Sequence, residues 1–183
     1  MKHVEEYRDG RLARALARRI AQEADRASGY RLMEFCGGHT HAIARYGIED
    51  LLPESVHLIH GPGCPVCVLP AGRIDAAIRL AERPGVTLCT YGDLMRVPGS
   101  NGMSFLRAKA RGADIRMVYS TLDALRVAEG EPARQVVFFA IGFETTTPPT
   151  AFAIRFASEK KLKNFTVFCN HVLTPPAIQK IRP

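Results

Sequence analysis

The sequence predicts an α/β protein with parallel sheets flanked by helices, and three observations lead to this fold class. Short, continuously apolar runs alternate with helical patterns along most of the 183 residues, which is typical of strands covered on both faces. Hydrophobic residues make up 46% of the chain, enough to bury a core. Motifs rich in glycine, cysteine and histidine follow the apolar runs, where parallel sheets carry their ligand sites.

Apolar residues at helical spacing predict an amphipathic helix within residues 1–28. Leu12, Leu16 and Ile20 recur every four residues with arginines between them, so one face of this helix is apolar. After Gly29 the helical periodicity ends and short apolar runs begin. The helix is therefore expected to form a segment of its own that packs on another part of the protein.

Strands and helices are predicted to alternate after this segment. Six apolar runs are predicted strands: residues 32–35, 56–59, 86–89, 115–119, 136–141 and 165–168. Four segments between them have helical patterns: residues 74–81, 105–110, 121–128 and 151–157. We expect two related Rossmann-like units, a first domain at 29–131 and the start of a second at 132–183. The second is expected to be truncated, because two strands rarely form an independent sheet.

Charge and hydropathy argue against nucleic-acid and membrane partners. Lys and Arg number 25 against 18 Asp and Glu, a formal charge of +7, but the basic residues are dispersed and not interleaved with aromatic ones. The longest apolar run, residues 136–141, is too short to span a bilayer, and residues 1–19 lack the apolar segment of a signal peptide. We therefore expect a cytoplasmic protein whose five cysteines are kept reduced.

The motif Cys64-Pro-Val-Cys67 is the sharpest chemical signal. Two intervening residues let a turn bring the two sulfur atoms into disulfide geometry, and a helix that follows favours the thiolate form. The same spacing could supply half of a zinc site. Because no second Cys-x-x-Cys motif occurs in the sequence, a redox pair or transient metal binding is the preferred interpretation.

Cys36 is the second signal, because it ends a predicted strand and precedes Gly37 and Gly38. Its sulfur is expected to face open space, as a metal-holding thiolate would. His39 and His41 could act as ligands, as proton carriers or as donors that favour the Cys36 thiolate. Each histidine could equally cap a helix or bond a carbonyl. Thiolate ligands favour iron or zinc over magnesium.

Two carboxylates that follow later strands each have a structural and a functional interpretation. The sequence Glu-Thr-Thr-Thr-Pro-Pro that begins at Glu144 is typical of a helix start, but Glu144 could also orient or protonate a ligand. Asp93 has the same two interpretations. Cys89 and Cys169 lie in apolar strands, where a cysteine usually behaves as a small hydrophobic residue.

Four motifs, taken together, resemble the HypD family of hydrogenase maturation factors. They are Cys-Gly-Gly-His-Thr-His at 36–41, Gly-Pro-Gly-Cys-Pro-Val-Cys at 61–67, Tyr-Gly-Asp-Leu-Met-Arg-Val-Pro-Gly-Ser at 91–100 and Gly-Phe-Glu-Thr-Thr-Thr-Pro-Pro at 142–149. The resemblance implies a scaffold on which the iron of a nickel–iron hydrogenase receives cyanide and carbon monoxide. It also implies that Cys36 holds this iron together with a thiol of a HypC-type chaperone.

The resemblance further implies that Cys64 and Cys67 are redox-active and that a HypE-type protein donates the cyanide. The resemblance also implies a longer protein, because members of the family are about twice the length of this chain. Their C-terminal part carries a 4Fe-4S cluster. None of the cysteines here has the spacing of those cluster ligands, so the cluster is not placed in this chain.

The hypothesis assigns two groups of residues to one site. The catalytic group comprises Cys64, Cys67, His39, His41 and Glu144, and the group that binds iron and its ligands comprises Cys36, Gly37, Gly38 and Asp93. Two alternatives stay open from the residues alone. One is a stand-alone thiol–disulfide oxidoreductase, and the other is a zinc-binding interaction module that uses all three motif cysteines and a histidine.

Overall fold

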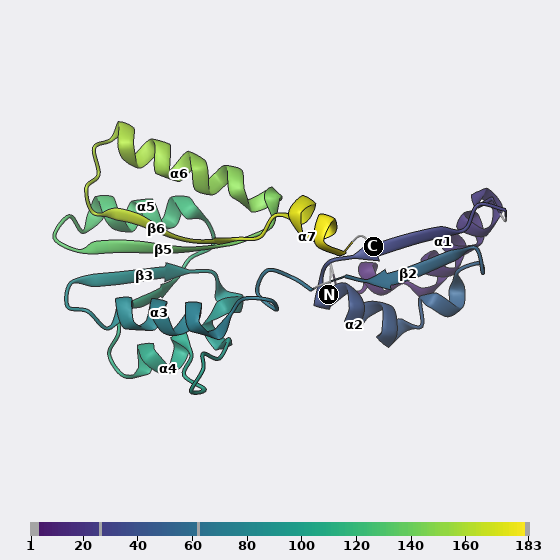
Figure 1. Cartoon of the computed structure of the whole chain (residues 1–183), viewed down its shortest axis with the longest axis horizontal. Coiled ribbons are helices and arrows are strands. Elements are labelled where there is room, and N and C mark those ends of the chain that lie inside the picture. The colour runs from purple at the N-terminus through teal and green to yellow at the C-terminus, as the bar shows by residue number, and fades with distance from the viewer. Residues whose placement is uncertain (1–3, 26, 62, 182–183) are drawn as a thin grey trace. The chain divides into compact units, whose positions relative to one another are not determined.

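The chain is an α/β protein with parallel sheets flanked by helices, which confirms the predicted fold class. The computed structural model describes residues 4–25, 27–61 and 63–181. It divides into two compact units, Met1–Cys64 and Pro65–Pro183, and each contains a parallel sheet of its own (Figure 1). We describe each unit separately.

The first unit contains a two-stranded sheet with two α-helices. Helix α1 spans Gly10–Glu23, β1 spans Tyr30–Glu34, α2 spans Gly37–Tyr46 and β2 spans Val56–His60, with single 3-10 turns at η1 (Glu6–Arg8) and η2 (Glu49–Leu51). Strands β1 and β2 are parallel, and their register places Tyr30 beside Val56 and Glu34 beside His60. The segments that follow these strands therefore leave the sheet at the same edge.

Helix α1 is the amphipathic helix that the periodicity predicts. The side chain of Asp9 accepts a hydrogen bond from the backbone N–H of Leu12 at 3.2 Å, which stabilises the start of the helix. The predicted apolar face is exposed: Leu12, Leu16 and Ile20 keep 53%, 55% and 40% of their surface accessible, whereas Ala17 is buried. Within its own unit, α1 therefore leaves its large apolar side chains uncovered.

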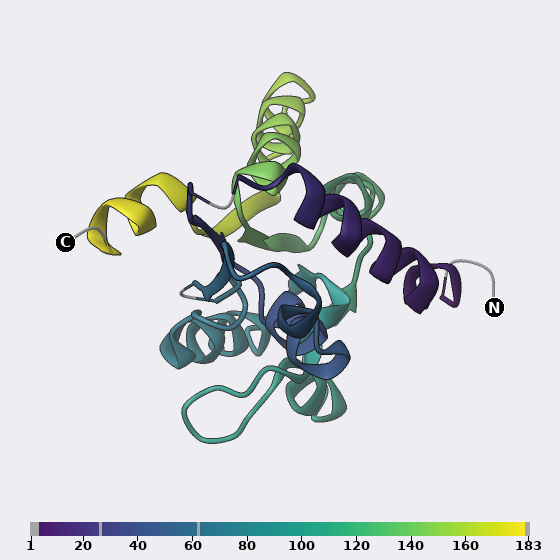
Figure 2. The same cartoon turned by 90° about the vertical axis from the view of Figure 1, so that its right-hand side faces the viewer.

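The second unit contains a four-stranded, wholly parallel sheet in the order β4-β3-β5-β6. Its main elements are α3 (Ala71–Ala81), β3 (Val86–Thr90), α4 (Phe105–Ala110), β4 (Ile115–Met117), α5 (Thr121–Gly130), β5 (Gln135–Gly142), α6 (Thr147–Glu159), β6 (Phe165–His171) and α7 (Thr174–Ile181). Two 3-10 segments follow β3 and β5, η3 (Gly92–Arg96) and η4 (Glu144–Thr146). Figures 1 and 2 show α3 and α4 on one face of the sheet and α6 on the other.

Strand β5 supplies the centre of both core layers. Its side chains alternate between the two faces: Val137, Phe139 and Ile141 pack with α3 and α4, and Val136, Phe138 and Ala140 pack with α5 and α6. A strand buried on both faces is a continuous apolar run, which is why residues 136–141 are so evenly hydrophobic. Full burial of one such large side chain stabilises the fold by about 1.5–3 kcal/mol.

All six predicted strands and all the predicted helices are present, with ends that shift by a few residues. Helices α2 and α7 are additional. The pair Gly37-Gly38 suggests a loop, but these glycines begin α2, because the carbonyl of Cys36 accepts hydrogen bonds from the N–H groups of His39 at 2.8 Å and Thr40 at 3.1 Å.

The sheet topology does not follow the expected domain boundary between residues 131 and 132. Strand β5 pairs with β3 over four residues, from Val86 beside Gln135 to Cys89 beside Phe138, so the sheet continues across that boundary. The two compact units instead meet between Cys64 and Pro65, and residues 29–64 share a unit with the N-terminal helix. The division follows from which strands pair: β1 pairs with β2, whereas β3 pairs with β4 and β5.

Candidate functional site

Cys36 lies at the N-terminal end of α2, directly beyond the end of β1. It is half-buried, and its side chain makes no capping hydrogen bond to the helix. A Cβ atom added to Gly38 would lie 3.5 Å from the Cys36 sulfur, so the glycine leaves room beside the thiol. Gly37, the first residue of α2, is exposed.

The carboxylate of Glu34 holds the turn that carries Cys36. Its Oε2 atom accepts the backbone N–H of Cys36 at 2.7 Å. Its Oε1 atom accepts the hydroxyl of Thr40 and contacts Nδ1 of His60 at 2.9 Å. The Thr40 hydroxyl, the His60 ring and the Cys36 N–H together lower the pKa of Glu34 to about 2. The carboxylate is therefore ionised at neutral pH.

His39 and His41 both lie on α2 and are exposed. Each residue of an α-helix is rotated by about 100° around the helix axis relative to the one before it. Residues 39 and 41 therefore lie about 200° apart around the axis, and the two imidazoles leave the helix in different directions. At most one of them can face the Cys36 sulfur. The helix thus separates the two imidazoles, and the roles predicted for them beside Cys36 stay predictions.

Cys64 and Cys67 lie on either side of the boundary between the compact units. Cys64 is half-buried and Cys67 is exposed. Residue 62 of the preceding motif lies outside the described residues. A Cβ atom on Gly61 would lie 2.5 Å from the carbonyl oxygen of Glu34, so only glycine fits where the segment toward Cys64 leaves β2.

The segment after Cys67 is anchored on the core of the second unit. Leu69 packs against the core layer beneath α3. Arg73, in the first turn of α3, donates to Oδ1 of Asn170 at 2.6 Å and to the carbonyl of Cys169 at 2.8 Å. Its guanidinium also lies 4.1 Å from the ring centre of Phe168. These contacts fix the start of α3 to the C-terminal half of β6.

A topological switch point lies between β3 and β5. These strands are neighbours, but α4 after β3 packs on one face of the sheet and α6 after β5 packs on the other. Ligands of open parallel sheets bind at such points. Asp93 follows β3 here and is exposed. The buried hydroxyl of Thr90, at the end of β3, has no hydrogen-bond partner among the described residues, which is unusual for a buried polar atom.

Glu144 follows β5 at this switch point and binds the start of α7. Its carboxylate accepts the backbone N–H of Thr174 and the Thr174 hydroxyl at 2.9 Å. The backbone N–H of Glu144 and the groups of Thr174 keep the pKa of this carboxyl below its ordinary value. At neutral pH Glu144 is therefore ionised and suited to accept hydrogen bonds rather than to donate a proton.

His171, at the end of β6, joins the same edge of the sheet to α6. Its Nδ1 lies 3.3 Å from the carbonyl of Gly142, and its Nε2 lies 3.0 Å from the hydroxyl of Thr150. Gly142 has a φ of +144°, and a Cβ atom there would lie 1.9 Å from Oγ1 of Thr146. The glycine that begins the Gly-Phe-Glu motif is thus required by the backbone.

The remaining cysteines differ from each other. Cys89 is fully buried between the sheet and α5, and burial raises the pKa of its thiol to about 12. It is the small core residue that the sequence predicts. Cys169 is exposed, although its strand is apolar. In residues 4–25, 27–61 and 63–181, no three His, Cys, Asp or Glu side chains are gathered so that they could hold a metal ion.

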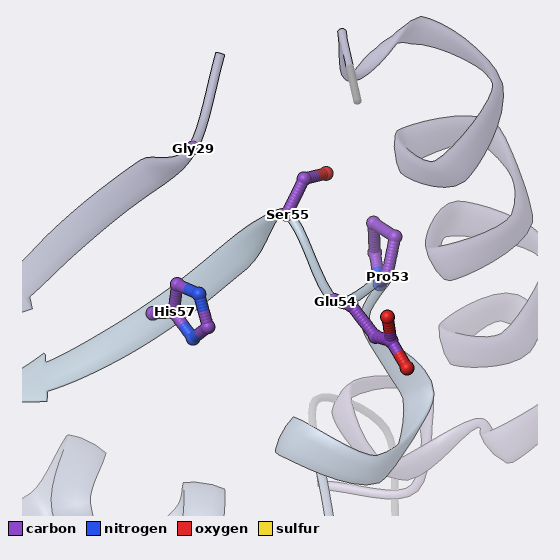
Figure 3. A pocket seen from close by; sticks show the side chains of 5 residues that line it. All are labelled: Gly29, Pro53, Glu54, Ser55 and His57. Carbon is purple, nitrogen blue, oxygen red and sulfur yellow. The ribbon is translucent and has the colours of Figure 1, made fainter. Parts of the chain in front are cut away.

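A pocket of about 540 Å³ opens at the opposite edge of the first sheet, where β1 and β2 begin. Gly29, Pro53, Glu54, Ser55 and His57 line it. Figure 3 shows that the side chains of Glu54, Ser55 and His57 point away from one another, so they do not form a catalytic triad. No helix in the described part of the chain is both long and apolar enough to span a bilayer.

Sequence reasoning missed Glu34 and His60. Each is the last residue of its strand, and the parallel register of β1 and β2 places them side by side. A charged residue in the otherwise apolar run before Cys36 was the available signal. Its partner could not be identified without the strand register.

Comparison with known proteins gives one family and several close relatives. The family model described as "HypD: Hydrogenase formation hypA family" matches residues 11–182. The chain is 72% identical over 181 residues to "Hydrogenase maturation factor HypD" of Rhizobium leguminosarum bv. viciae, which covers 99% of this chain and 47% of the relative.

Two further relatives have the same name. The protein from Azotobacter vinelandii is 67% identical over 181 residues, with 99% of this chain and 48% of the relative covered. The protein from Escherichia coli K12 is 50% identical over 186 residues, with 99% and 50% covered. The chain therefore spans about half the length of the curated relatives it matches.

Proposed function

Because the chain belongs to the HypD family, we propose that it forms part of a cytoplasmic scaffold that matures a nickel–iron hydrogenase. On this scaffold the iron is held while cyanide and carbon monoxide are added. The iron is the cargo of the scaffold, and Cys36 is the thiolate that holds it, together with a thiol of a HypC-type chaperone. A HypE-type protein donates the cyanide.

The placement of Cys36 carries this proposal. Its thiol lies at the N-terminal end of α2 and is not used to cap the helix. The N–H groups at the start of a helix favour a negative charge nearby, and thiolates favour iron over harder cations such as magnesium. Gly38 leaves space beside the sulfur. A half-buried thiolate beside such a space could bind a metal and a second protein together.

Cys64 and Cys67 have the redox role in this proposal. Oxidation of the two thiols to a disulfide releases two electrons and two protons. The acceptor in this proposal is a thiocyanate on the HypE-type donor, whose reduction gives a thiol and hydrogen cyanide. The core contact of Leu69 and the hydrogen bonds of Arg73 to β6 support this role, because they anchor the segment after Cys67 on the second unit.

Infrared spectroscopy of the anaerobically purified complex with the chaperone tests the proposal. We expect bands from iron-bound cyanide and carbon monoxide in the wild-type complex and their loss in Cys36→Ala. Cys169→Ala is the matched control, since it removes an exposed cysteine that lies outside the proposed site. Bands that persist in Cys36→Ala would remove Cys36 from the role.

The same preparation separates the two alternative functions. Reduction of insulin disulfides without iron or partners would favour a thiol–disulfide oxidoreductase that uses Cys64 and Cys67. One equivalent of tightly bound zinc would favour an interaction module. The proposal expects neither result.

A further inference from the structure

The carboxylate of Glu34 joins three separate segments of the first unit. Its side chain is only 13% exposed. It receives the N–H of Cys36 from the turn after β1, the hydroxyl of Thr40 from the first turn of α2 and the ring of His60 from the end of β2. Both oxygen atoms are used. A half-buried carboxylate with this many donors is held in one orientation.

Glu34 stabilises the start of α2 through contacts that do not use the Cys36 thiol. Cys36 occupies the cap position of α2, where Ser, Thr, Asp or Asn usually bonds the helix with its side chain. Here that side chain is a thiol without a capping bond, and Glu34 holds the turn by accepting the backbone N–H of Cys36 and the hydroxyl of Thr40. The thiol can therefore bind another group while the start of the helix stays ordered.

The same residue ties the Cys36 turn to the strand that leads toward Cys64. The backbone carbonyl of Glu34 accepts the N–H of Gly61 at 2.8 Å, and its side chain contacts His60 at 2.9 Å. Because Nδ1 of His60 donates to an ionised carboxylate, the lone pair of the neutral ring lies on Nε2. Glu34 thus fixes both the position of Cys36 and the tautomer of His60.

We propose that Glu34 is a positioning residue for the metal-holding thiol of Cys36. This inference rests on the proposed function of Cys36. Groups that orient a metal ligand typically change metal affinity or activity by about 10–100-fold when they are removed. Glu34 is such a group, because it acts on the peptide of Cys36 and does not need to touch the metal.

Amide hydrogen exchange of Cys36, followed by NMR in the iron-free full chain, tests the positioning directly. In Glu34→Ala we expect exchange at least roughly tenfold faster, because the N–H loses its acceptor. Glu34→Gln should restore most of the protection, since its amide oxygen can still accept this N–H. Glu54→Ala, at the opposite edge of the same sheet, is the matched control and should leave the exchange rate unchanged.

The His60 ring gives a second readout that general destabilisation would not produce. Nitrogen chemical shifts of the neutral ring should indicate the Nδ1–H tautomer in the wild type. In Glu34→Gln the amide NH2 can donate to Nδ1, so we expect the Nε2–H tautomer while Cys36 stays protected. If Glu34→Ala does not fold, Thr40→Val and Glu34→Gln still test the network, with Thr40→Val expected to accelerate exchange less than the loss of the carboxylate.

Infrared bands of the loaded complex then connect position to function. We expect band intensity in Glu34→Ala to fall by roughly 10–100-fold, with Glu34→Gln closer to the wild type. If the exchange rate of the Cys36 amide is unchanged in both Glu34 variants, the inference is overturned, regardless of the infrared result. Bands that persist in Cys36→Ala would instead overturn the proposed function, while the exchange and tautomer results would still report on Glu34.

Discussion

The two compact units bury their apolar residues to very different extents. Among the described residues, all the buried hydrophobic side chains except Ala17 belong to the second unit, where they form two layers around the four-stranded sheet. The first unit leaves Leu16, Leu32 and other large apolar side chains exposed. The structure of the first unit therefore depends more on hydrogen bonds such as those of Glu34. Because few apolar side chains are buried there, this polar network contributes a larger part of the stability around Cys36.

The largest contrast should come from truncating one apolar residue in each unit. Phe139 is fully buried and makes edge contacts to Phe105 and Phe168 at ring-centre distances of 5.4 and 5.5 Å. Phe139→Ala should lower the free energy of unfolding by about 3–5 kcal/mol. Leu16→Ala should change it by less than about 0.5 kcal/mol, as exposed sites usually do. Urea unfolding followed by circular dichroism measures both, and equal losses would refute the contrast.

Cysteine alkylation should distinguish the closed core of the second unit from the more accessible thiols of both units. The thiol of Cys89 is fully buried and has a pKa raised to about 12, so iodoacetamide at pH 8 should modify it roughly 100-fold more slowly than exposed Cys169. Cys36, in the thinly packed first unit, should react at a rate between the two. Peptide mass spectrometry gives the three rates, and fast labelling of Cys89 would show that the core of the second unit opens readily.

A backbone contact should matter more than side-chain burial in the first unit. Gly61→Ala would place a Cβ atom 2.5 Å from the carbonyl of Glu34, so β1 and β2 must separate, with an expected loss of about 1–3 kcal/mol. Gly29→Ala is the control, because its Cβ atom would meet nothing within 4 Å. Hydrogen exchange of the β1 and β2 amides measures the effect. Similar behaviour of the two variants would contradict it.

The smallest effect should be a pH dependence confined to the first unit. The pKa of Glu34 falls from 4.5 to about 2 in the folded state, so the carboxylate stabilises the fold above pH 4.5. This contribution is lost as the pH falls toward 2. In Glu34→Gln the acid side of the stability profile should be flatter. Exchange of the β1 amides between pH 5 and about pH 2 tests this, and identical profiles would exclude Glu34 as the titrating group.

Local patterns were sufficient to predict the strands and most helices, but not how the strands group. The apolar run at 136–141 identifies a strand buried on both faces, yet only the pairing of β5 with β3 shows that β5 and β6 belong to the same sheet as β3 and β4. Likewise, Gly37 and Gly38 have low helix propensity. They begin α2 because the Cys36 carbonyl accepts two N–H groups.

The chemical motifs identified Cys36, but not the residues that hold it. A cysteine followed by two glycines stands out in one segment of sequence, whereas Glu34 and His60 meet only through the register of two strands that are 26 positions apart. For His39 and His41 the sequence could not show the direction of the side chains. They are near Cys36 in sequence, and the helical turn separates their side chains.

The switch point between β3 and β5 has a consequence for how this unit can change during evolution. The chain leaves the two neighbouring strands in opposite directions, so the segments that begin with Asp93 and Glu144 are built on separate layers. A substitution in one segment can alter the polar groups at this edge of the sheet without repacking the layer under the other. The two segments can therefore diverge independently while the buried strands keep their sequence.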